Sequence, residues 1–161
     1  MTQITYVVRG SQVIPDVMLE VTPVLDTNVY AAGDVLFTTT EVANAARQAG
    51  KAINIQSLMV IDKDDQKPVF DLYFFDRTVT FGPFNAAPAI SDADAGYYVG
   101  HVSVASGDYK DLGGVSVASP AISEKIMQLA ATSLFIAAVN LSGTPTHTAS
   151  GLVLKLGISR S

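Results

Sequence analysis

The residues best suited to chemistry in this sequence are the aspartates of the stretch 62–65 and two histidines. Asp62, Asp64 and Asp65 have the close spacing of a calcium-binding loop. A calcium loop of the helix–loop–helix kind requires a Gly at its sixth position and a Glu at its twelfth. Lys67 and Tyr73 occupy those positions, so we interpret the three aspartates as part of a solvated turn.

His101 and His147 are the only histidines in the sequence, and there is no cysteine. A zinc site would therefore need carboxylates brought in from distant parts of the chain. Asp92 and Asp94 form a second acidic pair. We interpret that pair as part of a capped loop that begins at Ser91.

Sequence motifs for catalysis are missing. No Gly-x-Ser-x-Gly elbow accompanies the serines. Gly50 and Lys51 resemble the end of a phosphate loop, but Ala45 and Ala52 stand where that loop needs Gly and Ser or Thr. We therefore predict no catalytic, cofactor-binding or metal-binding residues, and a protein that is not an enzyme.

Composition narrows the possible partners. The chain has 161 residues, of which 48% are hydrophobic and only 16% charged, with a net charge of −5. That length suits one domain, and a surface so poor in charge suggests that other subunits cover part of it. Scattered basic residues argue against a nucleic-acid partner. Neither a membrane-spanning run nor the apolar core of a signal peptide is present, so we expect synthesis in the cytoplasm and no membrane partner.

Aromatic residues are concentrated in the middle of the chain. We select six of them as candidate interface residues: Tyr73, Phe75, Phe81, Phe84, Tyr97 and Tyr98. One interpretation places them in the core of the domain. The other places them in a subunit interface, where aromatic residues are enriched and charged residues are depleted.

The stretch Ser57–Asn85 contains the elements that would position these aromatics. It predicts two apolar strands that form a hairpin around the charged turn 62–67. Side chains alternate along a strand, and both faces of Val69–Phe75 are mostly apolar. Such a strand lies between two layers, or between one layer and a partner chain.

Many short strands, separated by turn residues at intervals of roughly 8–12 residues, indicate an all-β fold. We predict a single-domain β-sandwich, jelly-roll-like, over residues 16–161, with few or no short helices. Residues 1–15 are predicted as an N-terminal arm or edge strand. Residues 119–131 are ambiguous, because Ser119-Pro120 could begin a helix whereas Lys125–Ala130 could form a strand.

The order of several segments resembles that of virion proteins of tailed bacteriophages. The resemblance covers residues 13–158 and rests on these segments: Asp26–Val35, Ile55–Asp62, Asp71–Phe75, Ile90–Asp94, VGHVSV at 99–104, Leu134–Val139, Gly143–His147 and Leu152–Ile158. It implies a capsid decoration, or cement, protein and carries over no catalytic residues. It also favours a strand at Lys125–Ala130.

From this resemblance we expect a structural protein that forms a homo-oligomer, in particular a homotrimer. Its partner would be the major capsid protein of a phage, and its location the surface of the virion. The arm at residues 1–15 would reach a neighbouring subunit by strand addition. The alternative is a tail-fibre or lectin-like module that binds carbohydrate through Tyr97, Tyr98 and the loop of Asp92 and Asp94.

Overall fold

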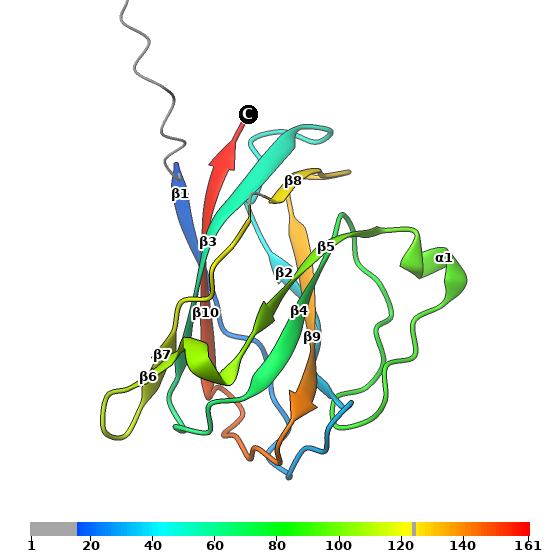
Figure 1. Cartoon of the computed structure of the whole chain (residues 1–161). Coiled ribbons are helices and arrows are strands. Elements are labelled where there is room, and N and C mark those ends of the chain that lie inside the picture. Colours follow the sequence, from blue (N-terminus) through cyan, green and yellow to red (C-terminus); the bar gives the residue numbers. More distant parts are fainter. Residues whose placement is uncertain (1–15, 124) are drawn as a thin grey trace, which may run out of the picture.

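The computed structural model describes residues 16–123 and 125–161. Two antiparallel sheets pack face to face in this part of the chain (Figure 1), which confirms the predicted all-β sandwich. The arm predicted at residues 1–15 lies outside the described residues.

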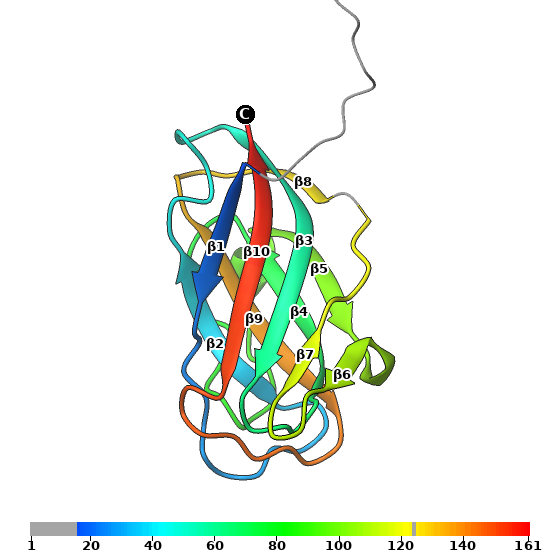
Figure 2. The same ribbon diagram turned by 90° about the vertical axis from the view of Figure 1, so that its left-hand side faces the viewer.

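The first sheet contains six strands and faces the viewer in Figure 2. Five of them follow the order β1-β10-β3-β7-β6, and β8 pairs with the far end of β3. Their bounds are Val17–Val21 for β1, Leu152–Arg160 for β10, Ala52–Asp62 for β3, Ser116–Ala118 for β7, Tyr109–Asp111 for β6 and Lys125–Gln128 for β8.

The second sheet contains four strands in the order β2-β9-β4-β5. Their bounds are Val35–Val42 for β2, Leu134–Ser142 for β9, Val69–Phe75 for β4 and Tyr98–Val104 for β5. The main core fills the space between the two sheets. Leu58 and Leu154 reach it from the first sheet, and Phe70, Phe74 and Ile136 from the second.

The chain repeatedly crosses from one sheet to the other, which is the reason for the jelly-roll-like order of strands. The predicted hairpin between the two strands of Ser57–Asn85 is therefore wrong. β3 pairs with β10, β7 and β8, whereas β4 pairs with β5 and β9. The charged turn after Asp62 is a crossover between the sheets, and residues 143–151 form a second crossover, from β9 to β10, at the same end of the sandwich (Figure 1).

Helices are few and short, as predicted. The α-helix α1 spans Asp92–Ala95, and a single 3-10 turn spans Ser106–Asp108. The Ser91 hydroxyl accepts a hydrogen bond from the Asp94 N–H and caps α1, which confirms the capped loop. The ambiguity at 119–131 resolves in favour of strand β8. No helix within the described ranges is long and apolar enough to cross a membrane.

Candidate functional site

Strand β4 separates two apolar layers. Its inward side chains Phe70, Leu72 and Phe74 are fully buried in the main core. On the opposite face, Phe75 is buried and Tyr73 half-buried in a second apolar cluster. Of the two predicted arrangements for this strand, the structure has the one in which it lies between two layers, and the second layer is formed by the connection between β4 and β5.

This connection, residues 76–97, folds over the outer face of the four-stranded sheet, and we refer to it as the covering segment. Figure 1 shows it as the green chain carrying α1, beside β4 and β9. Two backbone hydrogen bonds fasten it to β2, from Asn85 N to Val35 O at 2.8 Å and from Val35 N to Ala86 O at 2.7 Å. Val79 and Phe81 are its buried apolar contacts with the sheet.

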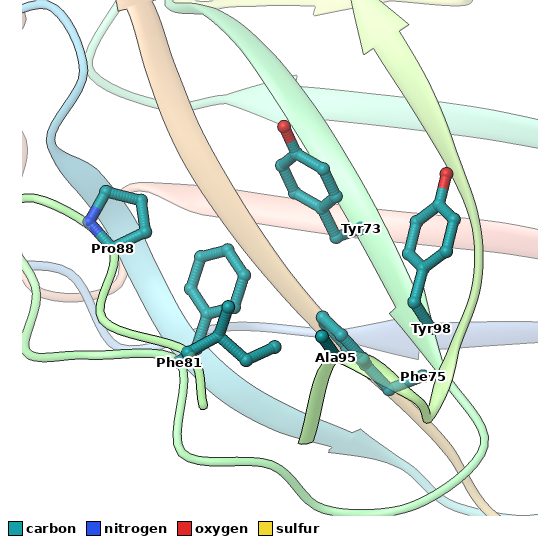
Figure 3. A pocket seen from close by; sticks show the side chains of 7 residues that line it. Tyr73, Phe75, Phe81, Pro88, Ala95 and Tyr98 are labelled. Atoms are coloured by element: carbon teal, nitrogen blue, oxygen red, sulfur yellow. The ribbon is translucent and has the colours of Figure 1, made fainter. Parts of the chain in front are cut away.

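The covering segment and the sheet leave a pocket of about 360 Å³ between them. Seven residues line this aromatic pocket: Tyr73, Phe75, Phe81, Pro88, Ile90, Ala95 and Tyr98. Figure 3 shows Tyr73 and Tyr98 side by side with their hydroxyls on the same side, and Phe81 and Pro88 opposite them. The wall is almost entirely carbon, so the pocket suits an apolar group.

Ring contacts join the aromatic pocket into one cluster. The centroid of Phe81 lies 5.7 Å from that of Tyr73 and 5.8 Å from that of Phe75. Tyr98 packs edge-on against Phe75 at 6.4 Å. These separations fall within the range at which aromatic pairs attract one another. The pocket therefore has a preorganised wall, and Tyr98, which is 45% exposed, forms its rim.

A β-bulge in β5 extends the rim to His101. The bulge occurs where Phe74 pairs with Gly100 but Phe75 pairs with Tyr98, so Val99 is the extra residue. Without a bulge, residues three apart would point to opposite faces of the sheet. With the bulge, Tyr98 and His101 share the outer face. Their rings stack with centroids 6.2 Å apart, and a hydrogen bond of 2.6 Å joins Tyr98 Oη and His101 Nδ1.

Four of the six candidate interface residues line the aromatic pocket, namely Tyr73, Phe75, Phe81 and Tyr98. The other two lie outside it. Phe84 is 39% exposed in the covering segment, and the Tyr97 ring packs under the Arg77 guanidinium at 4.3 Å.

Sequence reasoning missed Pro88, Ile90 and Ala95 as lining residues, and His101 as part of the rim. His101 is exposed on the outer face because it alternates with the buried Val102 and Val104. The bulge brings Tyr98 onto the same face, and the glycine at position 100 was the available signal for it. Within the acidic pair of Asp92 and Asp94, the Asp94 carboxylate has a structural contact, because it accepts a hydrogen bond from Thr80 N at 2.9 Å.

A second group of chemically capable residues meets at the end of the sandwich where the two crossovers lie. Asp62, Asp64 and His147 place one potential ligand atom each within 4.8 Å of one another. Asp62 and His147 are buried, whereas the Asp64 side chain is 17% exposed. The interpretation of a solvated turn is therefore wrong for Asp62.

Hydrogen bonds hold both carboxylates of this acidic–histidine cluster in place. Asp62 accepts from the backbone N–H groups of Lys67, at 2.6 Å, and Asp64, at 3.1 Å. Asp64 accepts from both the backbone N–H and the hydroxyl of Thr148. Burial lowers the pKa of the His147 imidazole, and the two nearby carboxylates oppose that shift only in part.

Comparison with family models, curated proteins and solved structures finds no match for the chain. Two parts of the described structure are therefore the candidate sites, the aromatic pocket and the acidic–histidine cluster. The aromatic pocket can bind an apolar group at a protein surface. The acidic–histidine cluster brings together oxygen and nitrogen donors in a largely buried position.

Proposed function

We propose that this chain is a non-enzymatic structural protein of a tailed-phage virion, a head decoration protein that binds across neighbouring capsid subunits. The observation that supports this function most is the aromatic pocket on the outer face of the four-stranded sheet. Its lining comes largely from the residues selected as interface candidates. The order of segments that resembles phage virion proteins supplies the class of partner.

The chemistry of the pocket favours a protein partner. Interface cores are enriched in aromatic side chains and depleted in charge. Only 16% of the residues of this chain are charged, and the seven lining residues carry no charge at all. An apolar side chain of the major capsid protein would enter the pocket, and Tyr98 and His101 would form the surrounding contact.

The mechanism in this proposal is adhesion. A homotrimer placed where capsomers meet would present three copies of the pocket to neighbouring capsid subunits. Each copy would bury apolar surface on binding, and each Å² of apolar area removed from water contributes roughly 25 cal/mol to the binding free energy. Contacts distributed over several subunits oppose their separation, and so stabilise the capsid against the pressure of packaged DNA.

The test is reconstitution of capsids that lack this chain with the purified protein. Truncating an aromatic residue that an interface buries costs about 1 kcal/mol or more, which corresponds to roughly 5-fold weaker binding. Docking would cover the exposed ring of Tyr98 at the rim of the pocket, so we expect a loss of at least that size for Tyr98→Ala. Leu112→Ala is the matched control, since Leu112 is an exposed apolar residue (63%) that follows β6 in the other sheet. Equal affinity of the two variants would contradict the assignment of the pocket.

Carbohydrate binding is the second candidate function. The exposed ring of Tyr98, stacked on His101, offers a flat aromatic surface of the kind on which sugar rings pack. Of the residues first considered for this role, Tyr97 is engaged by Arg77 and Asp94 by Thr80. A glycan array probed with the purified protein separates the two functions. Only the carbohydrate hypothesis predicts binding to a glycan, and it predicts that Tyr98→Ala removes that binding.

A further inference from the structure

We propose that Asp62, Asp64 and His147 bind a single divalent transition-metal ion, of which Zn²⁺ is the reference, and that this ion fastens the two crossovers of the sandwich together. Asp62 and Asp64 belong to the crossover from β3 to β4. His147 belongs to the crossover from β9 to β10. The site is independent of the aromatic pocket and of the function proposed for it.

The imidazole of His147 is the observation that distinguishes this cluster from an ordinary acidic turn. The residue is only 3% exposed, and neither ring nitrogen has a hydrogen-bond partner within the described part of the chain. A buried polar group without a partner is costly, and an ion is one of the few things that resolve it. Nδ1 faces the carboxylates, at 3.6 Å from Asp64 Oδ2 and 4.0 Å from Asp62 Oδ1.

These separations suit a shared ion better than a direct ion pair. A charge-assisted N–H···O bond brings the two atoms to about 2.7–2.9 Å. Ligands about 2.1 Å from a tetrahedral zinc ion lie about 3.4 Å apart. The distances of 3.6 Å and 4.0 Å exceed that spacing by about 0.2 Å and 0.6 Å.

The surroundings of the cluster hold the donors as a metal site requires. Groups that hydrogen-bond to ligating carboxylates fix their orientation. Here Lys67 N and the Ser116 hydroxyl bind Asp62 Oδ2, and Thr148 binds Asp64. The partial exposure of Asp64 leaves a side on which an ion can arrive and a water can complete the coordination.

The donor set also selects among ions. Imidazole is a good ligand for Zn²⁺ and its first-row neighbours, whereas Ca²⁺ takes six to eight oxygen ligands. Two aspartates cannot supply that number. We therefore expect Zn²⁺ to bind and Ca²⁺ to leave the protein unchanged at the same concentration.

Gly151 provides a way to disturb the site without removing a ligand. A Cβ atom at this position would overlap with Asp64 Oδ2 and would lie 3.2 Å from Thr148 O. The backbone there is not in the left-handed region, so alanine adds no strain of that kind. In Gly151→Ala the Asp64 carboxylate has to leave its place, although all three donors remain in the chain.

The experiment uses the full chain, stripped with a chelator and titrated with ZnSO₄ or CaCl₂ by calorimetry. We expect saturable binding of one Zn²⁺ per chain and, at 100 times Kd, an increase of about 5–10 °C in Tm. His147→Asn and Asp64→Asn should each weaken binding by at least 100-fold. Gly151→Ala should weaken it by at least 10-fold.

His101→Asn is the matched control, because His101 is an exposed histidine outside the cluster; it should bind Zn²⁺ as the wild type does. Each variant is first compared with wild type by circular dichroism in the absence of metal. The proposal is overturned if wild-type protein shows no saturable Zn²⁺ binding. It is equally overturned if His147→Asn binds Zn²⁺ as tightly as the wild type. Loss of binding in His101→Asn would then place the ion at the surface.

Discussion

Two adjacent phenylalanines on β4 test whether the covering segment is a separate layer. Phe74 points into the main core and Phe75 into the second apolar cluster, and both are about 99–100% buried, with exposures of 0% and 1%. The substitutions Phe74→Ala and Phe75→Ala therefore remove the same atoms from opposite faces of one strand. Any difference between them reports on the layer that each ring contacts.

The expected magnitudes follow from these contacts. Phe74 lies between the two sheets, so Phe74→Ala should lower the free energy of unfolding of the whole domain by about 3–5 kcal/mol. Phe75 packs on Phe81 of the covering segment. Its loss should lower the free energy of opening that segment by about 2–3 kcal/mol. Opening of the covering segment exposes fewer apolar groups than global unfolding does. In Phe75→Ala it therefore becomes the easier route to amide hydrogen exchange for this segment.

Hydrogen exchange measured by mass spectrometry separates the two effects. In Phe75→Ala, amides of residues 76–97 should exchange roughly 30–150-fold faster, while those of β3 and β10 change much less. The Ala89 amide, which donates to Phe81 O at 3.0 Å, is a direct reporter. In Phe74→Ala, the strands and the segment should be affected together. Identical exchange profiles in the two variants would refute the idea of a separately opening layer.

Two further predictions concern the packing around other loops. Burial raises the pKa of the Tyr30 hydroxyl to about 12, above the unfolded value of about 10. The stability that this difference contributes to the folded protein is therefore complete below pH 10 and is lost as the pH rises from 10 to 12. Urea titrations should therefore show that the free energy of unfolding falls by up to about 2.7 kcal/mol between pH 10 and pH 12, and by less in Tyr30→Phe. A pH profile of the variant identical to that of the wild type would contradict this prediction. Gly82 has a φ of +114°, and an added Cβ would lie 3.1 Å from Ala89 N, so Gly82→Ala should cost about 1–3 kcal/mol in urea denaturation; a neutral effect would show that the loop adapts without strain.

Strand positions were predictable where the apolar pattern was strong. The strands β3 and β4 match the two apolar strands predicted in Ser57–Asn85, because burial on a sheet imposes its period on the side chains. The short strand β6 was not predicted, since Tyr109–Asp111 lies among turn residues and owes its structure to pairing with β7. At Lys125–Gln128 the local helix signal of Ser119-Pro120 yields to the pairing with Ala52–Ile55.

The wrong hairpin shows the limit of local turn chemistry. Residues 62–68 carry clear turn signals, and the structure does turn there. Such signals describe the change of direction of the chain, but they do not say whether the next strand returns in the same sheet or enters the opposite one. That choice depends on long-range pairing, here of β3 with β10 and of β4 with β9.

The same long-range pairing explains why the aromatic pocket was partly foreseen and the acidic–histidine cluster was not. Aromatics that crowd one stretch of sequence have a good chance of meeting, and the register of β4 with β5 completes the pocket by placing Tyr98 opposite Phe75. His147 is far from Asp62 in sequence. The two meet because the β3–β10 register pairs Asp62 with Leu152.

That register also puts the chain just before β10 against the turn after β3, as the hydrogen bond from Lys63 N to Gly151 O at 2.8 Å shows. His147 lies a few residues further back along this crossover, and so it reaches Asp62 and Asp64. The spacing test on the aspartates excluded a calcium loop built from one segment. It had no bearing on a site assembled from two crossovers, and for such a site the pairing of two distant strands is the deciding information.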